Sequence, residues 1–160
     1  MSLAFIWQDD YCIDNGIIDQ EHLRLFKLAN AVLAIERPSK NVLNVKKALR
    51  RFFEYTRYHF LDEEKCMLRI GYSQFEAHAI AHRQIIAIMN DMVRRCGNTE
   101  DYIPVLEHIM HDWIIRHITE IDKELGKYLH VRKESEYTVS KQNILQEVIE
   151  NMPSLDIGLL

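Results

Sequence analysis

Two pairs of candidate metal ligands lie close together in the middle of the chain. His59 and Glu63 are four residues apart, and so are His78 and His82. On an α-helix, residues at this spacing share one face, with Cβ atoms roughly 5–6 Å apart, so each pair can present two ligand atoms to one point. The break at Gly71-Tyr72-Ser73 would let two consecutive antiparallel helices aim both pairs at the same interior spot.

Three further side chains extend this set to seven. The candidate ligands are His22, His59, Glu63, His78, His82, His117 and Asp122. Five imidazoles and two carboxylates are too many for one tetrahedral ion. They suit two six-coordinate ions, because bridging carboxylates, a bridging solvent oxygen and the imidazoles fill all but one position, where a small molecule such as O2 would bind. Iron, zinc, copper and manganese accept such ligands, whereas the lack of thiolates argues against copper(I) and iron–sulfur centres.

Four long helical patterns must position these side chains. Apolar residues recur at helical spacing over about residues 19–36, 42–69, 73–96 and 101–129. Asp19 is the expected N-cap of the first helix, and Ser73 with Glu76 is a capping box for the third. Each helix carries at least one candidate ligand and the connectors are short. We therefore expect an all-α, antiparallel up-down-up-down four-helix bundle; an irregular domain of crossed helices is the alternative.

The two ends of the chain differ from this pattern. Residues 1–18 indicate an irregular N-terminal arm, which we expect to pack across the end of the bundle. Residues 131–160 indicate a C-terminal helical extension, with an apolar stripe that ends before Pro153. This extension could dock on the bundle, form a homodimer or connect to an output domain. We thus expect one ligand-binding domain over residues 1–130, followed by an extension or linker over residues 131–160.

Composition excludes several classes of protein. The length of 160 residues suits a single domain, and 20 basic against 24 acidic residues give a net charge of −4. This balance predicts neither a nucleic-acid partner nor a membrane partner. The N-terminus lacks the positive region of a signal peptide. The three cysteines are odd in number and widely spaced, which is typical of a reducing compartment and indicates a cytoplasmic protein.

Four stretches of the sequence resemble the hemerythrin family, in particular its bacterial members. They are Ile18-Asp19-Gln20-Glu21-His22, His59-Phe60-Leu61-Asp62-Glu63-Glu64, Gly71-Tyr72 followed by His78 and His82, and Trp113-Ile114-Ile115-Arg116-His117-Ile118 followed by Asp122. The resemblance covers about residues 1–130. The full set is highly specific, although one pair of histidines four residues apart would be weak evidence.

The resemblance implies a cofactor and a function. In this family His78, His82 and His117 would hold one iron ion, and His22 and His59 would hold the other. Glu63 and Asp122 would bridge the two ions together with an oxo or hydroxo group. The open position would fall on the ion with two histidines. The resemblance therefore implies reversible O2 binding, for oxygen sensing, storage or delivery, rather than enzymatic activity.

One spacing does not follow from helical geometry. His117 and Asp122 are five residues apart, which leaves them about 140° apart around an ideal helix. On geometry alone, Glu120 or Glu124 would serve equally well. The resemblance selects Asp122, and we expect it to reach the metal from the side of the helix or through a local distortion.

The resemblance also implies an apolar pocket around the open position. The matching residues are Leu25, Phe60, Trp113, Ile114 and Ile118. Such a pocket would exclude water and protons and so disfavour autoxidation, the loss of bound O2 as peroxide or superoxide. Greater access of solvent would favour a sensor or a leak of peroxide.

Two other functions compete with O2 binding. The first is a diiron redox enzyme: an oxidase, a peroxidase or a nitric-oxide-consuming protein. Such bundle enzymes usually carry carboxylate-rich sites with Glu-x-x-His motifs, which are absent here at the relevant places. The second is a zinc or structural site, which would need fewer ligands and no open pocket. His111-Asp112 also resembles the dyad of HD-type phosphohydrolases, but the rest of that pattern is missing.

The remaining histidines and one cysteine lie outside the pattern. We expect His108, His111 and His130 to be surface residues. Cys66 follows His59 by seven residues and so points roughly the same way. A buried, inert thiol is the simpler interpretation of Cys66, and a redox-sensing role is the alternative.

Overall fold

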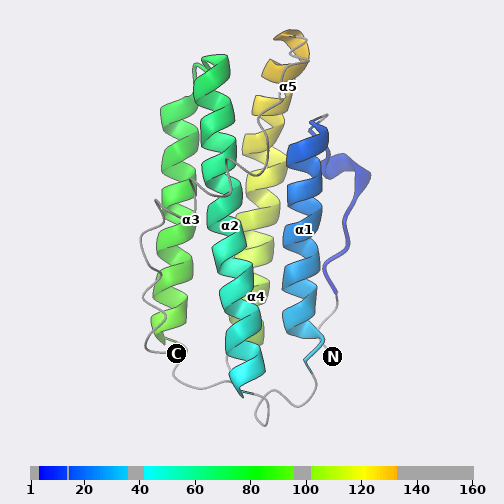
Figure 1. Ribbon diagram of the computed structural model, residues 1–160, viewed down its shortest axis with the longest axis vertical. Coiled ribbons are helices and arrows are strands. Elements are labelled where there is room, and N and C mark those ends of the chain that lie inside the picture. The colour runs from blue at the N-terminus through cyan, green and yellow to red at the C-terminus, as the bar shows by residue number, and fades with distance from the viewer. Residues whose placement is uncertain (1–3, 14, 36–41, 96–101, 133–160) are drawn as a thin grey trace.

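The chain forms a bundle of long helices in the computed structural model (Figure 1). The structure describes residues 4–13, 15–35, 42–95 and 102–132. The first three rods are single helices: α1 (Gly16–Leu33), α2 (Val42–Ile70) and α3 (Phe75–Arg95). The fourth helical rod is continuous but changes type along its length, through α4 (Tyr102–His108), η4 (Ile109–Ile115), η5 (His117–Asp122) and α5 (Lys123–Arg132). The segments η4 and η5 are π-helical.

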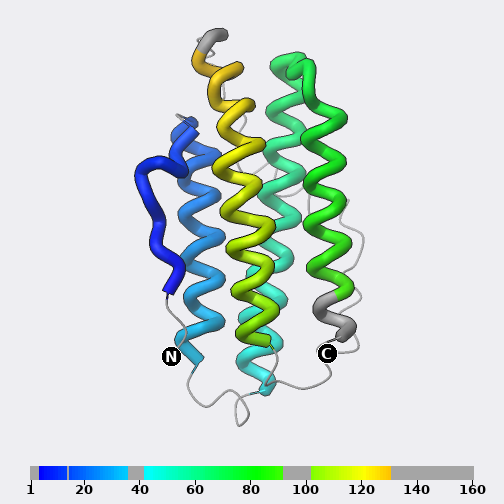
Figure 2. The backbone as a smooth tube through the Cα atoms, turned by 180° about the vertical axis from the view of Figure 1, so that it is seen from behind, coloured from blue at the N-terminus to red at the C-terminus, as the bar shows by residue number. Residues whose placement is uncertain are grey.

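The four rods run alternately up and down, and each lies beside its neighbour in sequence. Helix α1 lies next to α2, and α2 next to α3, in Figure 1. Seen from behind, the fourth rod lies between α1 and α3 (Figure 2). The antiparallel four-helix bundle expected from the sequence is therefore confirmed, and the alternative of crossed helices is wrong.

Two apolar clusters fill the bundle, and the candidate ligands lie between them along each rod. The larger cluster includes Leu25, Phe53 and Ile118, and the smaller includes Ile18, Met67 and Leu125. In α1, for example, the chain passes from Ile18 to Leu25 with a candidate histidine in between. Burial of the apolar stripes on both sides therefore fixes the depth at which each rod presents its polar residues.

The start of α1 differs from the prediction. Asn15, not Asp19, is the N-cap: its side chain accepts from the backbone N–H groups of Ile17 and Ile18. Asp19 lies in the first turn and accepts from the N–H groups of Ile13 and Asn15, at 2.8 and 3.1 Å. The prediction was wrong because Asp and Asn are both good N-caps, and the asparagine comes first along the chain.

The N-terminal arm lies along α1 instead of across the end of the bundle (Figure 1). The N–H of Phe5 donates to Asn30 Oδ1, and Asn30 Nδ2 donates back to the Phe5 carbonyl, both at 2.8 Å. Trp7 packs edge-on against Phe26, and its ring centroid is 6.3 Å from that of His22. Apolar side chains of the arm thus cover the outer side of α1, which the sequence pattern alone does not reveal.

A short turn at Gly71 joins α2 to α3. Gly71 has a φ of 64°, a left-handed conformation that glycine adopts at little cost. Helix α3 begins at Phe75, two residues later than predicted, and Glu76 pairs with Arg83 at 2.9 Å. The tight turn brings the second half of α2 alongside the first half of α3, where two pairs of candidate ligands lie.

Some predictions concern segments that the structure does not describe. The apolar stripe predicted for residues 144–152 lies outside the described residues, as does Cys96. Among the described helices, none is both long enough and apolar enough to cross a membrane.

Candidate metal centre

All seven predicted ligands point into the interior of the bundle. None has more than 3% of its surface exposed. Their ligand atoms fall into two groups, each with atoms within 4.8 Å of one another. The three-histidine group consists of Glu63, His78, His82, His117 and Asp122, and the two-histidine group consists of His22, His59, Glu63 and Asp122. Both carboxylates belong to both groups.

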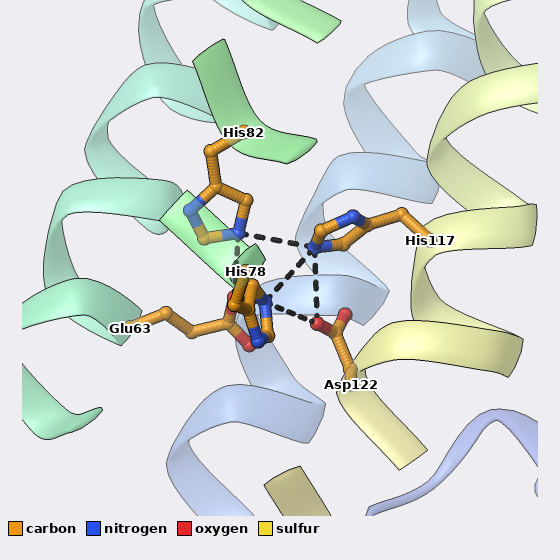
Figure 3. Close-up of side chains that lie close together, drawn as sticks. All are labelled: Glu63, His78, His82, His117 and Asp122. Atoms are coloured by element: carbon orange, nitrogen blue, oxygen red, sulfur yellow. Dashed lines mark hydrogen bonds and ion pairs between the residues drawn. The ribbon is translucent and has the colours of Figure 1, made fainter. Parts of the chain in front are cut away.

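The three-histidine group is compact (Figure 3). His117 Nε2 lies 3.1 Å from His78 Nε2 and 3.0 Å from His82 Nε2. Asp122 Oδ1 lies 3.1 Å from the Nε2 atoms of both His78 and His117. Glu63 Oε2 lies 3.2 Å from His82 Nε2. Three imidazoles and two carboxylates from three rods therefore face one point.

The two-histidine group is looser. His22 Nε2 lies 3.2 Å from Asp122 Oδ2 and 3.8 Å from Glu63 Oε1. His59 Nε2 lies 4.0 Å from Glu63 Oε2. The two rings of His22 and His59 are 4.7 Å apart and nearly perpendicular. Asp122 thus turns one oxygen toward each group, Oδ1 to one and Oδ2 to the other.

These contacts fit ligands around a cation better than they fit hydrogen bonds. His82 Nδ1 donates to Glu64, so in the neutral ring Nε2 has only a lone pair, and that lone pair faces Glu63 Oε2. Among the described residues, both oxygens of Glu63 and of Asp122 are buried without a hydrogen-bond partner. Two ligand atoms about 2.1 Å from one ion, at right angles to each other, would be about 3.0 Å apart. The separations of 3.0–3.2 Å in the three-histidine group match that value, so this donor set fits a metal.

Helix α2 and segment η5 each supply two of these residues at different spacings. In α2 the pair His59 and Glu63 follows the regular α-helical spacing of four. In η5, which is π-helical, each backbone N–H bonds to the carbonyl five residues back, so residues five apart share a face. This local distortion, one of the two routes that we expected, brings Asp122 beside His117.

The alternative carboxylates of the fourth rod point away from the cluster. Glu120 is exposed and pairs with Arg116, and Glu124 is exposed and pairs with Lys127. On an ideal α-helix either residue would have been as good a candidate as Asp122. The π-helical geometry explains why Asp122 is buried with the histidines.

The comparison with known families agrees with this geometry. Residues 14–129 match the family model described as the hemerythrin HHE cation binding domain. This chain belongs to the hemerythrin family.

Several curated relatives have the name bacteriohemerythrin. That of Clostridium acetobutylicum is 29% identical over 128 residues, which cover 75% of this chain and 97% of the relative. That of Stenotrophomonas maltophilia is 30% identical over 118 residues, 74% of this chain and 76% of the relative. That of Methylococcus capsulatus is 27% identical over 115 residues, 71% of this chain and 87% of the relative. The hemerythrin domain binds non-heme iron, and the buried cluster of this chain fits such a metal.

The carboxylates of the hemerythrin site are held in their charged form. Burial and their mutual repulsion raise the pKa of Glu63, but the surrounding histidines His59, His78 and His82 outweigh both and hold it well below its usual value. The pKa of Asp122 is likewise well below its usual value, because His117 and its neighbours outweigh the cost of burial. Both side chains are therefore ionised and ready to bind a cation at neutral pH.

The histidines respond to burial in different ways. Burial lowers the pKa of His117. For His59, burial also disfavours the charged form, but the charges of Glu63 and Glu21 outweigh it and raise the pKa. For His78, contacts with Asp122 and Glu63 outweigh burial and raise the pKa to about 9. Metal binding must displace those protons, so it will release protons to solvent near neutral pH.

Sequence reasoning missed two carboxylates behind the ligands. His59 Nδ1 donates to Glu21 Oε2 at 3.2 Å, and His82 Nδ1 donates to Glu64 Oε1 at 2.9 Å. Both glutamates are next to a candidate ligand in the sequence, but adjacent residues of a helix face different directions, so the pattern did not link them to the site. Glu21 lies four residues before Leu25 and so falls on the apolar side of α1, which is the signal that could have indicated its burial.

The five predicted pocket residues lie in or against the larger apolar cluster. Leu25, Phe60, Ile114 and Ile118 are buried members of it. Phe60 stacks on His82 with ring centroids 4.0 Å apart. Trp113 is only half-buried: its indole N–H donates to His108, and it lines a surface groove of about 440 Å³ that also reaches His117.

The other histidines lie on the surface, as predicted. His108, His111 and His130 are exposed. Asp112 pairs with His108. Cys66 is 1% exposed, which agrees with the prediction of a buried cysteine.

Proposed function

We propose that this protein binds O2 reversibly at a pair of non-heme iron ions held by the seven buried side chains. The observation that carries the proposal is the sharing of both carboxylates between two groups of imidazoles. One ion needs no such arrangement, since four to six ligands complete its coordination. Two ions side by side require groups that can bridge them.

The atoms that face each group support an assignment of roles. His78, His82 and His117 would hold one iron ion, and His22 and His59 the other. Asp122 turns Oδ1 toward His78 and His117 and Oδ2 toward His22. Glu63 likewise turns Oε2 toward His82 and Oε1 toward His22. Each carboxylate is thus oriented to bridge the two ions.

The unequal number of histidines supports the location of the O2 site. With two imidazoles instead of three, an ion held by His22 and His59 would have one protein ligand fewer, which would leave a coordination position for O2. Iron ions bound in this way would supply the electrons on which reversible O2 binding depends. The apolar side chains of Leu25, Phe60, Ile114 and Ile118 keep water and protons away from the site, which slows oxidation of the metal.

A diiron redox enzyme is the second candidate function. One observation favours it: the groove lined by Trp113 and His117 brings solvent to the edge of the three-histidine group. Against it, the ligand set is rich in histidine, whereas bundle enzymes that activate O2 generally use carboxylate-rich sites. The two candidates therefore differ in how fast the oxygenated protein decays.

Metal analysis combined with an optical spectrum tests the proposal. The protein would be reconstituted with iron(II) without air, then exposed to air and degassed again. Two iron ions per chain and a charge-transfer band that appears with O2 and disappears on degassing are expected. Rapid bleaching with release of peroxide would indicate an oxidase instead. A colourless protein that retains only zinc would contradict both candidates.

We further propose that residues 1–130 form the O2-binding domain and that residues 131–160 connect it to a partner, either a second copy or an output module. Removal of residues 131–160 tests this division. A truncated chain that binds O2 as before but changes its oligomeric state would support it. Loss of O2 binding on truncation would show that the extension belongs to the domain.

A further inference from the structure

A histidine that binds a metal through Nε2 has its second nitrogen, Nδ1, available for an outer partner. In this chain, Nδ1 of His59 donates to Glu21 and Nδ1 of His82 donates to Glu64. The Nδ1 atoms of the other three candidate imidazoles have no hydrogen-bond partner among the described residues. The two-histidine group and the three-histidine group therefore each contain one histidine with a carboxylate behind it.

The two carboxylates differ in their exposure to solvent. The side chain of Glu21 is 1% exposed, whereas that of Glu64 is 22% exposed. Water around Glu64 screens its charge, but the surroundings of Glu21 have a low effective dielectric constant. The charge of Glu21 therefore acts on His59 more strongly than the charge of Glu64 acts on His82, although the second hydrogen bond is shorter.

The neighbours of Glu21 show that its charge extends beyond His59. Burial, and then the negative charge of Glu21, raise the pKa of Tyr58 to about 12. The same two causes raise the pKa of Tyr55. The guanidinium of Arg24, an exposed residue, lies over the ring of Tyr55 at 4.8 Å from its centroid. Glu21 contacts the metal cluster through its hydrogen bond to His59.

We infer that Glu21 is a positioning residue for the metal ion held by His22 and His59. Its carboxylate can only accept, so it holds the proton on His59 Nδ1 and leaves the lone pair of Nε2 for the metal. Its buried charge also makes that imidazole a stronger electron-pair donor to a metal ion. Glu64 supports His82 in the same way but more weakly. The inference rests on the proposed two-ion site and makes the two ions electronically unequal.

This inequality has a direction. A more strongly donating imidazole stabilises the more oxidised form of the ion that it binds. Glu21 would therefore favour the loss of electrons from an ion held by His22 and His59, where the open position is proposed. An ion held by the three-histidine group, with a partly screened carboxylate behind His82, would receive less of this effect.

Zinc binding provides a test that needs neither O2 nor redox chemistry. The metal-free protein would be titrated with zinc against a chelator of known affinity, as wild type and as Glu21→Gln, Glu64→Gln and Glu54→Gln variants. Glutamine keeps an acceptor of the same size but removes the charge. Glu54 is a matched control because it lies in α2 with His59 but pairs with Arg50, away from the site.

The three variants are expected to lose zinc affinity to different extents. Glu21→Gln should weaken one of the two zinc-binding steps about tenfold or more, within the range of 10–100-fold typical of outer partners of a metal-bound histidine. Glu64→Gln should weaken binding about threefold or less, and Glu54→Gln should have no effect. A loss of less than about twofold for Glu21→Gln, or an equal loss for Glu64→Gln, would overturn the inference.

Proton NMR of the metal-free protein, which detects protons bound to nitrogen, distinguishes failure of this inference from failure of the proposed function. Wild type should show an Nδ1–H signal of His59 shifted downfield and protected from exchange, which Glu21→Ala removes and Glu21→Gln moves upfield. Circular dichroism would establish that each variant is folded. If wild type shows the signal but binds fewer than two ions, the proposed function fails while the role of Glu21 stands. A His59 signal that is unchanged in Glu21→Ala would contradict the role of Glu21.

Discussion

Helix α2 and the fourth helical rod perform the same task in different ways. Helix α2 is α-helical over its 29 residues and presents His59 and Glu63 from one face. The fourth rod presents His117 and Asp122, five residues apart, from a π-helical segment. In both rods a histidine and a carboxylate face the same cluster. The comparison teaches that the hydrogen-bond register of the backbone, as well as the spacing in the sequence, decides which side chains can meet.

Removal of either shared carboxylate should have the largest effect. Glu63→Ala and Asp122→Ala should each lower iron affinity by more than about 100-fold, the upper end for an outer partner, because each removes a ligand from both ions. Metal analysis after dialysis measures the loss. His111→Ala is the control, since His111 is exposed and belongs to neither group. If all three variants retain equal iron, the proposed ligand assignment is wrong.

A carboxylate moved by one residue should not replace Asp122. In the double variant Ile121→Asp with Asp122→Ala, the acid would stand four residues after His117, the spacing that works in α2. Ile121 lines the surface groove, so an acid there faces solvent. Iron content should stay as low as in Asp122→Ala alone. Recovery of iron binding would mean that this part of the rod is α-helical in solution.

The charged cluster should give the metal-free protein an unusual dependence of stability on pH. His78 contacts both shared carboxylates, and its pKa is raised to about 9, against about 6.5 in an unfolded chain. Because the folded-state pKa is the higher one, this stabilisation is complete below about pH 6.5 and is lost as the pH rises through about 9. The lowered pKa values of Glu63 and Asp122 keep both acids charged throughout this range.

Thermal unfolding of the metal-free protein measures this effect. The melting temperature should fall between pH 6.5 and pH 9. His78→Gln should reduce this slope but not abolish it, because the raised pKa of His59 acts in the same direction. Burial lowers the pKa of His117, but the resulting loss of stability occurs below about pH 6.5. It therefore does not affect the range between about pH 6.5 and 9. A melting temperature that rises between about pH 6.5 and 9 would show that the carboxylates do not favour the protonated form of His78.

The smallest effect is expected where the fourth rod meets the N-terminal arm. A Cβ added to Gly126 would lie 2.8 Å from the Ile13 carbonyl oxygen and 2.9 Å from Ile13 Cβ. Gly126→Ala should therefore displace the arm and reduce the free energy of unfolding by about 1–3 kcal/mol. Gly16→Ala is the matched control, because no atom of the described residues beyond its chain neighbours lies within 4 Å of the added carbon. Equal stability of the two variants would mean that the arm can be displaced without a change in the free energy of unfolding.

The regular part of the bundle could be predicted from the sequence. The bounds of α2 were predicted to within one residue, because its apolar stripe and its pairs at a spacing of four follow the same period. The seven candidate ligands were gathered from four rods, and the structure brings all of them together. Their selection depended partly on family resemblance, since periodicity alone left Glu120 and Glu124 open.

What the sequence did not predict involves contacts between distant segments. The course of the arm depends on a pair of hydrogen bonds between Phe5 and Asn30, 25 residues apart. The contact of Glu21 with His59 spans 38 residues and two helices. Patterns within one helix contain no information about such partners.

The position of Trp7 gives the protein a built-in optical probe. Its indole ring lies 6.3 Å from the ring of His22, close enough for a coloured metal ion at that histidine to quench its emission efficiently. Only one other tryptophan, Trp113, is present, so a Trp113→Phe variant would emit from Trp7 alone. Fluorescence of that variant would then report the filling of the two-histidine group in real time.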